Sequence, residues 1–140
     1  MSKSPLCTIM FVYVVGFLPP AAAANPTFEC TVTSVHAVAE DGSVVTDTEH
    51  LKKQIGSRFS VDKKSGAIRG SYFLDNTHSK HIKVTNSPPE NTYYVVTESH
   101  GPIVMIGYLY IGKHRKGPHK PFTYTSSGEY IYSGFCRDRG

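Results

Sequence analysis

The sequence lacks several features that would assign it to a common class of protein. No apolar run is repeated along its 140 residues, which excludes a protein with several membrane spans. The 15 lysines and arginines only slightly outnumber the 11 aspartates and glutamates, and a formal charge of +4 is too small for a dedicated nucleic-acid binder. A chain of this length has room for one hydrophobic core, so a single globular domain is expected.

Common catalytic and cofactor motifs are also missing. The chain contains no G-x-S-x-G, G-x-G-x-x-G, P-loop or H-E-x-x-H sequence. Residues 60–63 (SVDK) match S-x-x-K and residues 64–66 (KSG) are close to K-T-G, but penicillin-recognising enzymes place these elements far apart in the chain. Here both fall within one expected hairpin, so we expect a protein that is not an enzyme and needs no cofactor.

Residues 1–24 have the composition of a secretory signal peptide. A basic start precedes the apolar run of residues 5–18, and a Pro-Pro pair separates that run from a row of alanines. A membrane-spanning helix needs about 20 apolar residues, more than this interrupted run supplies, so an uncleaved anchor is the weaker interpretation. We expect cleavage after Ala24 and one domain over residues 25–140, periplasmic or secreted and without stable insertion into a membrane.

Cysteine is scarce, and its distribution predicts one disulfide. Cys7 lies inside the expected signal peptide, which leaves only Cys30 and Cys136 in the mature chain. An even pair in an oxidising compartment favours a bond, whereas a catalytic thiol pair needs closer spacing such as C-x-x-C. Closing a loop of about 100 residues stabilises a fold by about 4 to 5 kcal/mol in the chain-entropy model.

Short runs of alternating apolar and polar residues recur between turn-forming residues, as is typical of β-strands. The strand-like segments are residues 28–38, 58–61, 67–70, 81–85, 92–98, 103–111, 122–125 and 130–136. The connections are too short for crossover helices, so the pairing must be mainly antiparallel. We therefore expect an all-β antiparallel meander of seven or eight strands, closed as a small barrel or sandwich.

Two segments carry more detailed expectations. Residues 47–55 are expected to form at most one short helix, with Asp47 or Thr48 as its N-cap and Gly56 just beyond its end. Residues 103–111 (IVMIGYLYI) are apolar almost throughout. Such continuity predicts the most buried strand of the domain.

Residues 59–70 follow the pattern F-x-V-D-x-x-S-G-x-I-x-G. Together with Cys30 and Cys136, this segment resembles small exported bacterial proteins that have no assigned activity. The resemblance covers this segment and the two cysteines, and it implies a location in the cell envelope without implying a mechanism.

Residues 112–121 form the one dense basic cluster of the chain, with four lysines and arginines, two histidines and no acid. A basic loop between two strands can bind phosphate or carboxylate through charge-assisted hydrogen bonds, and Tyr108, Tyr110 and Tyr124 lie near enough in sequence to add aromatic faces. The alternative is a hairpin tip that its charges merely keep solvated. The expected anion-binding residues are Lys113, His114, Arg115, Lys116, His119 and Lys120.

The seven histidines do not have the spacing of a known metal site. His78 and His81 are three residues apart, and residues three apart on a strand point to opposite faces. A site there would need a turn at His78 or a further ligand such as His36 or His100. The spacing therefore favours scattered surface histidines and predicts no metal site.

These observations predict an exported, non-catalytic binding or inhibitory module of the cell envelope. The expected partner is an anionic envelope polymer or an extracytoplasmic protein, and not a nucleic acid. A periplasmic metal-binding protein that uses the surface histidines is the alternative. An enzyme whose site is assembled from residues distant in sequence is a third interpretation.

Mass spectrometry of the native exported protein is expected to find a chain that starts near Asn25, because the small residues at positions 21–24 suit a signal peptidase. A product that still begins at Met1, or one that is extracted only with the membrane fraction, would contradict this expectation.

Overall fold

The computed structural model describes residues 25–46, 48–87, 91–127 and 129–140. The expected signal peptide, residues 1–24, lies outside the described residues. So does Asp47, one of the two expected helix caps.

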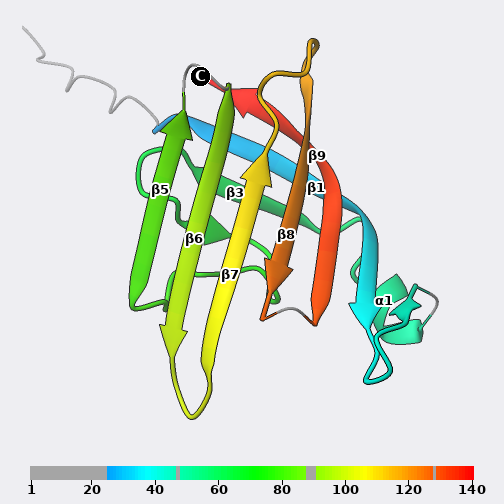
Figure 1. The fold of residues 1–140 in the computed structure, drawn as a ribbon. Helices are drawn as coiled ribbons and strands as arrows, with labels where there is room; N and C mark the ends of the chain where they lie inside the picture. The colour runs from blue at the N-terminus through cyan, green and yellow to red at the C-terminus, as the bar shows by residue number, and fades with distance from the viewer. Residues whose placement is uncertain (1–24, 47, 88–90, 128) are drawn as a thin grey trace, which may run out of the picture.

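Strands dominate the described part of the chain, which confirms the all-β expectation (Figure 1). The strands are β1 (Thr27–Val38), β2 (Val44–Val45), β3 (Arg58–Asp62), β4 (Ile68–Arg69), β5 (His81–Ser87), β6 (Thr92–His100), β7 (Val104–Ile111), β8 (His119–Ser126) and β9 (Tyr130–Arg139). The one helix found there is α1 (Glu49–Lys52), which is N-capped by Thr48 as expected.

All the strands belong to one antiparallel sheet with the order β4-β3-β1-β9-β8-β7-β6-β5, and the short β2 pairs with the end of β1. The segment from β5 to β9 is a meander in which each strand lies beside the next. β1 then lies between β9 and β3, so the first long strand and the last strand are neighbours. The sheet curls into a half-barrel (Figure 1). The expected antiparallel meander is thus present, and it curls in the manner of a small barrel.

A glycine in β9 lies where β1 and β9 come unusually close. The β1–β9 register shifts between Val32 and Ser34, so β1 carries an irregularity opposite Gly134. A Cβ added to Gly134 would lie 2.0 Å from the carbonyl oxygen of Thr31 and 2.8 Å from the ring of Phe122. No side chain fits at this position, and glycine allows the two strands to approach each other here.

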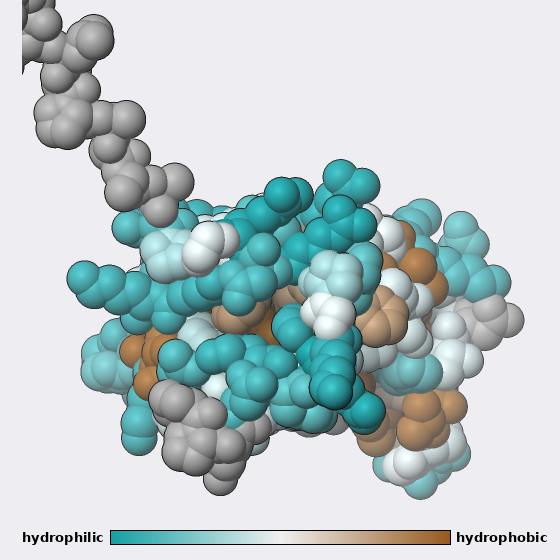
Figure 2. Space-filling model, turned by 90° about the horizontal axis from the view of Figure 1, so that it is seen from above, coloured by the Kyte–Doolittle hydropathy of each residue, from teal (hydrophilic) through white to brown (hydrophobic). Residues whose placement is uncertain are grey.

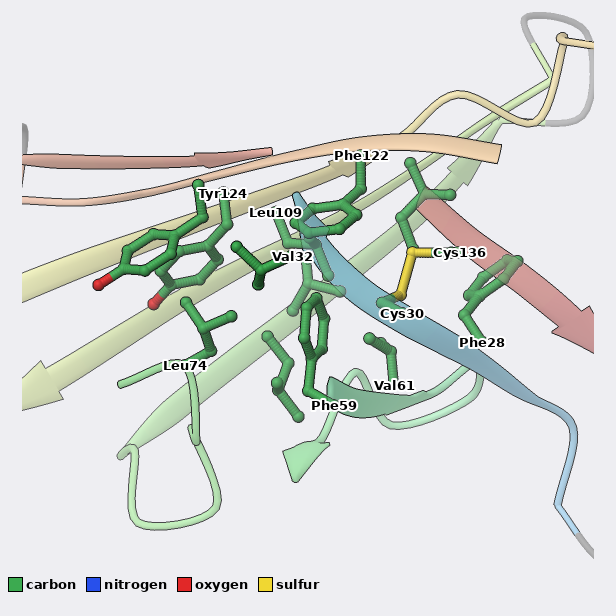
Figure 3. Packing of buried hydrophobic residues seen from close by; sticks show 14 of the residues in the cluster. Phe28, Cys30, Val32, Phe59, Val61, Leu74, Leu109, Phe122, Tyr124 and Cys136 are labelled. Atoms are coloured by element: carbon green, nitrogen blue, oxygen red, sulfur yellow. A yellow bond between two sulfur atoms is a disulfide. The ribbon is translucent and has the colours of Figure 1, made fainter. Parts of the chain in front are cut away.

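The concave face of the sheet holds the core (Figure 3). Strand alternation turns one set of side chains inward, and the edge of Phe59 from β3 packs on Phe122 from β8, with ring centroids 5.1 Å apart. The buried residues at this face include Phe28, Cys30, Val32, Val61, Leu74, Tyr93, Val95, Leu109, Ile111, Tyr124 and Cys136. Removal of this apolar area from water is the main stabilising contribution to the fold.

Asn76 holds the two ends of the curled sheet together. Its side chain is only 2% exposed. The Oδ1 atom accepts from the backbone N–H of Ile68 in β4 at 2.6 Å, and Nδ2 donates to the Gly66 carbonyl at 3.0 Å and to Thr97 Oγ1 of β6 at 3.1 Å. One side chain therefore joins the β3–β4 hairpin to a strand from the other end of the sheet.

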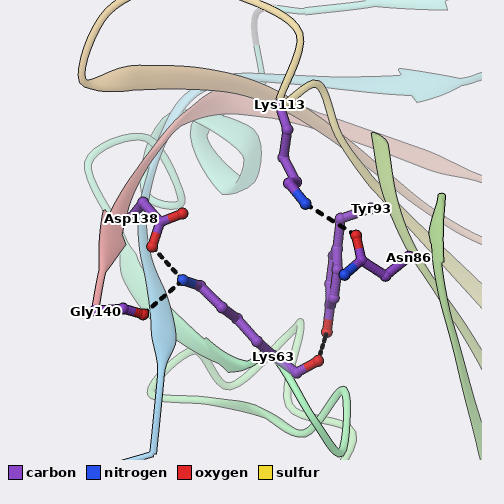
Figure 4. A network of polar contacts seen from close by, with 6 residues as sticks. All are labelled: Lys63, Asn86, Tyr93, Lys113, Asp138 and Gly140. Carbon is purple, nitrogen blue, oxygen red and sulfur yellow. Dashed lines mark hydrogen bonds and ion pairs between the residues drawn. The ribbon is translucent and has the colours of Figure 1, made fainter. Parts of the chain in front are cut away.

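A second set of contacts closes the same gap (Figure 4). The Tyr93 hydroxyl of β6 donates to the carbonyl oxygens of Asp62 and Lys63, at 3.1 and 3.2 Å. The Lys63 ammonium in turn donates to the Asp138 carboxylate and to the Gly140 carbonyl near the chain end. The hairpin that fills the open side of the half-barrel is thus attached to both β6 and β9.

The expected disulfide is present. Cys30 and Cys136 are directly opposite each other on β1 and β9, with Cα atoms 3.9 Å apart, and both side chains are buried in the core (Figure 3). The bond therefore joins the two strands whose pairing links the beginning of the domain to its end.

The expectation that residues 103–111 form the most buried strand is wrong. Val104, Met105 and Ile106 of β7 are 49% to 55% exposed, and Ile103 is more exposed still. β8 pairs with β7 only from Gly107 onward, so the beginning of β7 extends past β8 and is paired by β6 alone. Apolar continuity therefore does not mark burial here, because no strand other than β6 pairs with this part of β7 among the described residues.

No helix in the described part of the chain is both long and apolar enough to cross a membrane.

Reduction of the Cys30–Cys136 bond is expected to lower the free energy of unfolding by about 2 to 5 kcal/mol, because the unfolded chain regains the freedom of a long loop. Urea titration of oxidised and reduced protein measures the difference. Thiol titration of the unfolded, unreduced mature protein should find no free thiol, and two titratable thiols would refute the bond.

Replacement of Asn76 by Ala is expected to cost about 2 to 4 kcal/mol, because it leaves buried partners from two ends of the sheet without a hydrogen bond. Chemical denaturation of the variant measures this cost. Lys64→Ala changes an exposed side chain on the same hairpin and serves as the control, with an expected effect within about 0.5 kcal/mol. Equal stability of the two variants would show that Asn76 does not hold the sheet ends together.

Candidate functional site

The expected basic cluster lies where β7 turns into β8, but it is not one uniform loop. Residues 112–118 form the connection, whereas His119 and Lys120 already belong to β8 and pair with Arg137 and Cys136 of β9. The cluster is therefore divided between a loop and the first residues of a strand.

Two of its lysines stabilise the loop. The Lys113 ammonium donates to Asn86 Oδ1 of β5 at 2.9 Å (Figure 4), and the Lys113 carbonyl accepts from Asn91 Nδ2 at 3.1 Å. The Lys120 ammonium donates to the Arg115 carbonyl. Both ammonium groups hydrogen-bond to other parts of the protein and hold the loop in place, so their primary role is structural.

The remaining basic residues of the loop face solvent. His114, Arg115 and Lys116 are exposed. Their side chains have no hydrogen-bond or ion-pair partner among the residues that the structure describes. The structure thus separates the cations that hold the loop from those that present charge to solvent.

A groove of about 690 Å³ lies on the outer face of the sheet, beside this cluster. Alternation along β1 explains its position, since Phe28, Cys30 and Val32 point into the core and the residues between them point outward. The groove is lined by Thr27, Glu29, Cys30, Thr31, Thr33, Arg58, His119, Phe135, Arg137 and Arg139.

Strand register aligns the charged residues of the groove in rows. His119 of β8 is opposite Arg137 of β9, which is itself opposite Glu29 of β1. Arg139 lies one row further along β9, opposite Thr27.

On the other side of the His119–Arg137–Glu29 row, Phe135 is opposite Thr31, and Thr31 is opposite Arg58 of β3. The His119 and Phe135 rings are in edge contact, with centroids 6.2 Å apart. His119 is therefore shared by the basic cluster and the groove.

Positive charge in the groove is only partly offset within the described residues. Arg58, Arg137 and Arg139 are exposed, and their guanidinium groups have no partner in the described ranges. Glu29 is the single carboxylate among the lining residues. Figure 2 looks onto the end of the molecule that carries the C-terminus and the β7–β8 loop, and hydrophilic residues dominate that surface. The groove and the loop together form a basic surface suited to an anion.

Sequence reasoning missed the three arginines of the groove. Arg137 and Arg139 are two residues apart on the last strand, a spacing that puts both on one face, and this signal was available. Arg58 is distant in sequence from both, and only the position of β1 between β3 and β9 brings it to the same surface.

The tyrosines expected beside the basic cluster have different positions. Tyr108 is 39% exposed and Tyr110 is half-buried, and both lie on the outer face. Tyr124 is only 6% exposed, because alternation along β8 turns it toward the core, where burial raises the pKa of its hydroxyl. The expectation that Tyr124 can contact a ligand is wrong.

Two of the histidines considered as metal ligands, His81 and His100, lie close together, whereas His36 lies on β1 and His78 in a loop. His78 lies in the loop after β4, and the His36 ring is within 2.8 Å of Ser34 Oγ. The rings of His81 and His100 have centroids 6.1 Å apart, and His100 Nε2 is 2.6 Å from Glu98 Oε1. In the described segments, no group of three histidines, cysteines or carboxylates has the geometry to hold a metal ion.

Comparisons of this chain with protein-family models, with curated proteins and with solved structures find no match.

Proposed function

We propose that this protein is an exported, non-catalytic binding module of the cell envelope, and that its ligand is an anionic polymer held by the outer groove and the adjacent loop. The observation that carries the proposal is that one groove is lined by Arg58, Arg137 and Arg139, whose guanidinium groups have no partner in the part of the chain that the structure describes, next to the exposed Arg115 and Lys116 of the β7–β8 loop.

The charge arrangement favours an anion with several charged groups. Arginines bind carboxylates and phosphates through two parallel hydrogen bonds. Arg137 and Arg139 lie on one face of β9, and their like charges repel each other until an anion offsets them. The groove involves β3, β1, β9 and β8. Four neighbouring strands span about 14 Å, so the surface accommodates several units of a chain and exceeds the size of one small anion.

Other features support an exported protein. A buried disulfide between the first long strand and the last strand is typical of proteins that fold in an oxidising compartment. The composition of residues 1–24 and the resemblance of residues 59–70 to exported bacterial proteins agree with that location.

The proposal predicts that a triple variant, Arg58→Ser, Arg137→Ser and Arg139→Ser, binds polygalacturonate, polyglutamate and polyphosphate at least about tenfold more weakly than the parent protein. The slope of log affinity against log salt should also decrease, because fewer counterions are released. Surface plasmon resonance at several salt concentrations measures both quantities.

A matched control removes the same charge elsewhere. Lys53, Lys64 and Lys80 are exposed and lie outside the groove and the loop, so their replacement by Ser should leave each affinity within about twofold of the parent. Equal losses in the two triple variants would mean that only net charge matters. Selective capture of an acidic protein without binding to any polymer would favour an extracytoplasmic protein as partner and would overturn the proposal.

A further inference from the structure

Three tyrosines form a continuous strip on the outer face of β6 and β7. Tyr94 is directly opposite Tyr110, and Tyr108 lies one row further along β7. The ring centroids of Tyr94 are 5.3 Å from those of Tyr110 and 5.7 Å from those of Tyr108, with interplanar angles of 43° and 37°. We call Tyr94, Tyr108 and Tyr110 the tyrosine strip.

The tyrosine strip leads directly into the basic loop. A Cβ placed on Gly112 would lie 3.1 Å from the Tyr110 hydroxyl, 3.2 Å from the His114 ring and 3.4 Å from Pro121. The end of the strip and the exposed His114 ring of the loop therefore border the same backbone position. The aromatic rings lead into the loop that carries Arg115 and Lys116.

The strip is not needed to fill the core. The adjacent residues in each strand, Tyr93 and Val95 in β6 and Leu109 and Ile111 in β7, are the ones that point inward and are buried. Tyr108 keeps 39% of its surface exposed, and its neighbour across the ladder, Val96, keeps 37%. An open, shallow aromatic surface of this kind is available to a ligand.

We propose that the ligand of the basic surface is an acidic polysaccharide, whose sugar rings pack on the tyrosine strip while its anionic groups contact Arg115, Lys116 and the arginines of the groove. This inference rests on the proposed function. The C–H face of a pyranose ring is apolar and its edge is polar, which matches the apolar ring and polar hydroxyl of tyrosine. A polymer that alternates sugar rings with negative charges can contact the tyrosine strip and the basic residues at the same time.

The Tyr108 hydroxyl does not add negative charge to the strip. Desolvation and the neighbouring Tyr94 and Tyr110 raise the pKa of Tyr108, so this phenol stays neutral. A neutral hydroxyl can donate or accept a hydrogen bond at the edge of a sugar ring without repelling an anionic chain.

The geometry favours a sugar chain over single-stranded nucleic acid. Proteins that bind single strands combine stacked bases with a strongly positive groove that tracks the backbone. Here the rings are tilted against one another, the formal charge of the chain is only +4, and the buried disulfide favours a compartment outside the cytoplasm.

The test compares a double variant, Tyr108→Ala with Tyr110→Ala, with the parent by isothermal titration calorimetry. The probes are polygalacturonate and polyglutamate of equal charge. Affinity for polygalacturonate should fall about tenfold, whereas affinity for polyglutamate, which has no sugar ring, should stay within about twofold. Phenylalanine at both positions should restore most of the lost affinity. Tyr72→Ala, which removes a 92% exposed tyrosine from another surface, is the matched control and should change neither affinity.

A second measurement needs no variant. In NMR spectra of the parent protein, the ring signals of Tyr94, Tyr108 and Tyr110 should shift with polygalacturonate and should not shift with polyglutamate. This measurement decides the question if the double variant fails to fold.

The outcomes separate the inference from the function on which it rests. Binding of both polymers with equal affinity, and without effect of the tyrosine variants or shifts of the ring signals, keeps the anion-binding function and overturns the polysaccharide assignment. Tighter binding of oligothymidylate than of polygalacturonate overturns that assignment in favour of nucleic acid. Failure of the parent to bind any of these polymers overturns both proposals.

Discussion

The pairing of β1 with β9 is the constraint on which the rest of the structure depends. It joins a meander of β5 to β9 to the β3–β4 hairpin through a continuous ladder of backbone hydrogen bonds. The Cys30–Cys136 bond lies within this pair, and Gly134 permits its close approach. The same pairing aligns the arginines of β9 with the outward residues of β1, so one contact both closes the fold and creates the groove.

The half-barrel closes through side chains where backbone pairing ends. Asn76 and Tyr93 connect the β3–β4 hairpin to β6, and apolar side chains from both ends of the sheet meet in the core. Close packing of the concave side leaves the convex side for interactions with other molecules. The candidate site therefore lies on a rigid sheet surface and extends onto one loop, an arrangement that positions charges well because strand register determines their spacing.

The contacts of the basic residues divide them into those that hold the β7–β8 loop and those that present charge to solvent. Lys113 and Lys120 are hydrogen-bonded to neutral acceptors and hold the β7–β8 loop in place. Arg115 and Lys116, together with the arginines of the groove, keep their charges exposed. A surface whose cations repel one another costs stability that an anionic ligand would offset, and the adjoining tyrosine strip adds apolar contact without adding charge.

The sequence by itself determined the features that depend on neighbouring residues. Alternation and turn residues located most strands, the helix start was predicted to within Asp47 or Thr48, and two remaining cysteines predicted their bond. Only the tertiary structure decided which strands became neighbours, since pairing between distant segments depends on register and closure. That choice brought Arg58 to the same groove as Arg137, turned Tyr124 inward and left the apolar beginning of β7 paired by β6 alone. Local patterns describe one strand at a time, whereas exposure and charge clustering depend on what lies on either side of it.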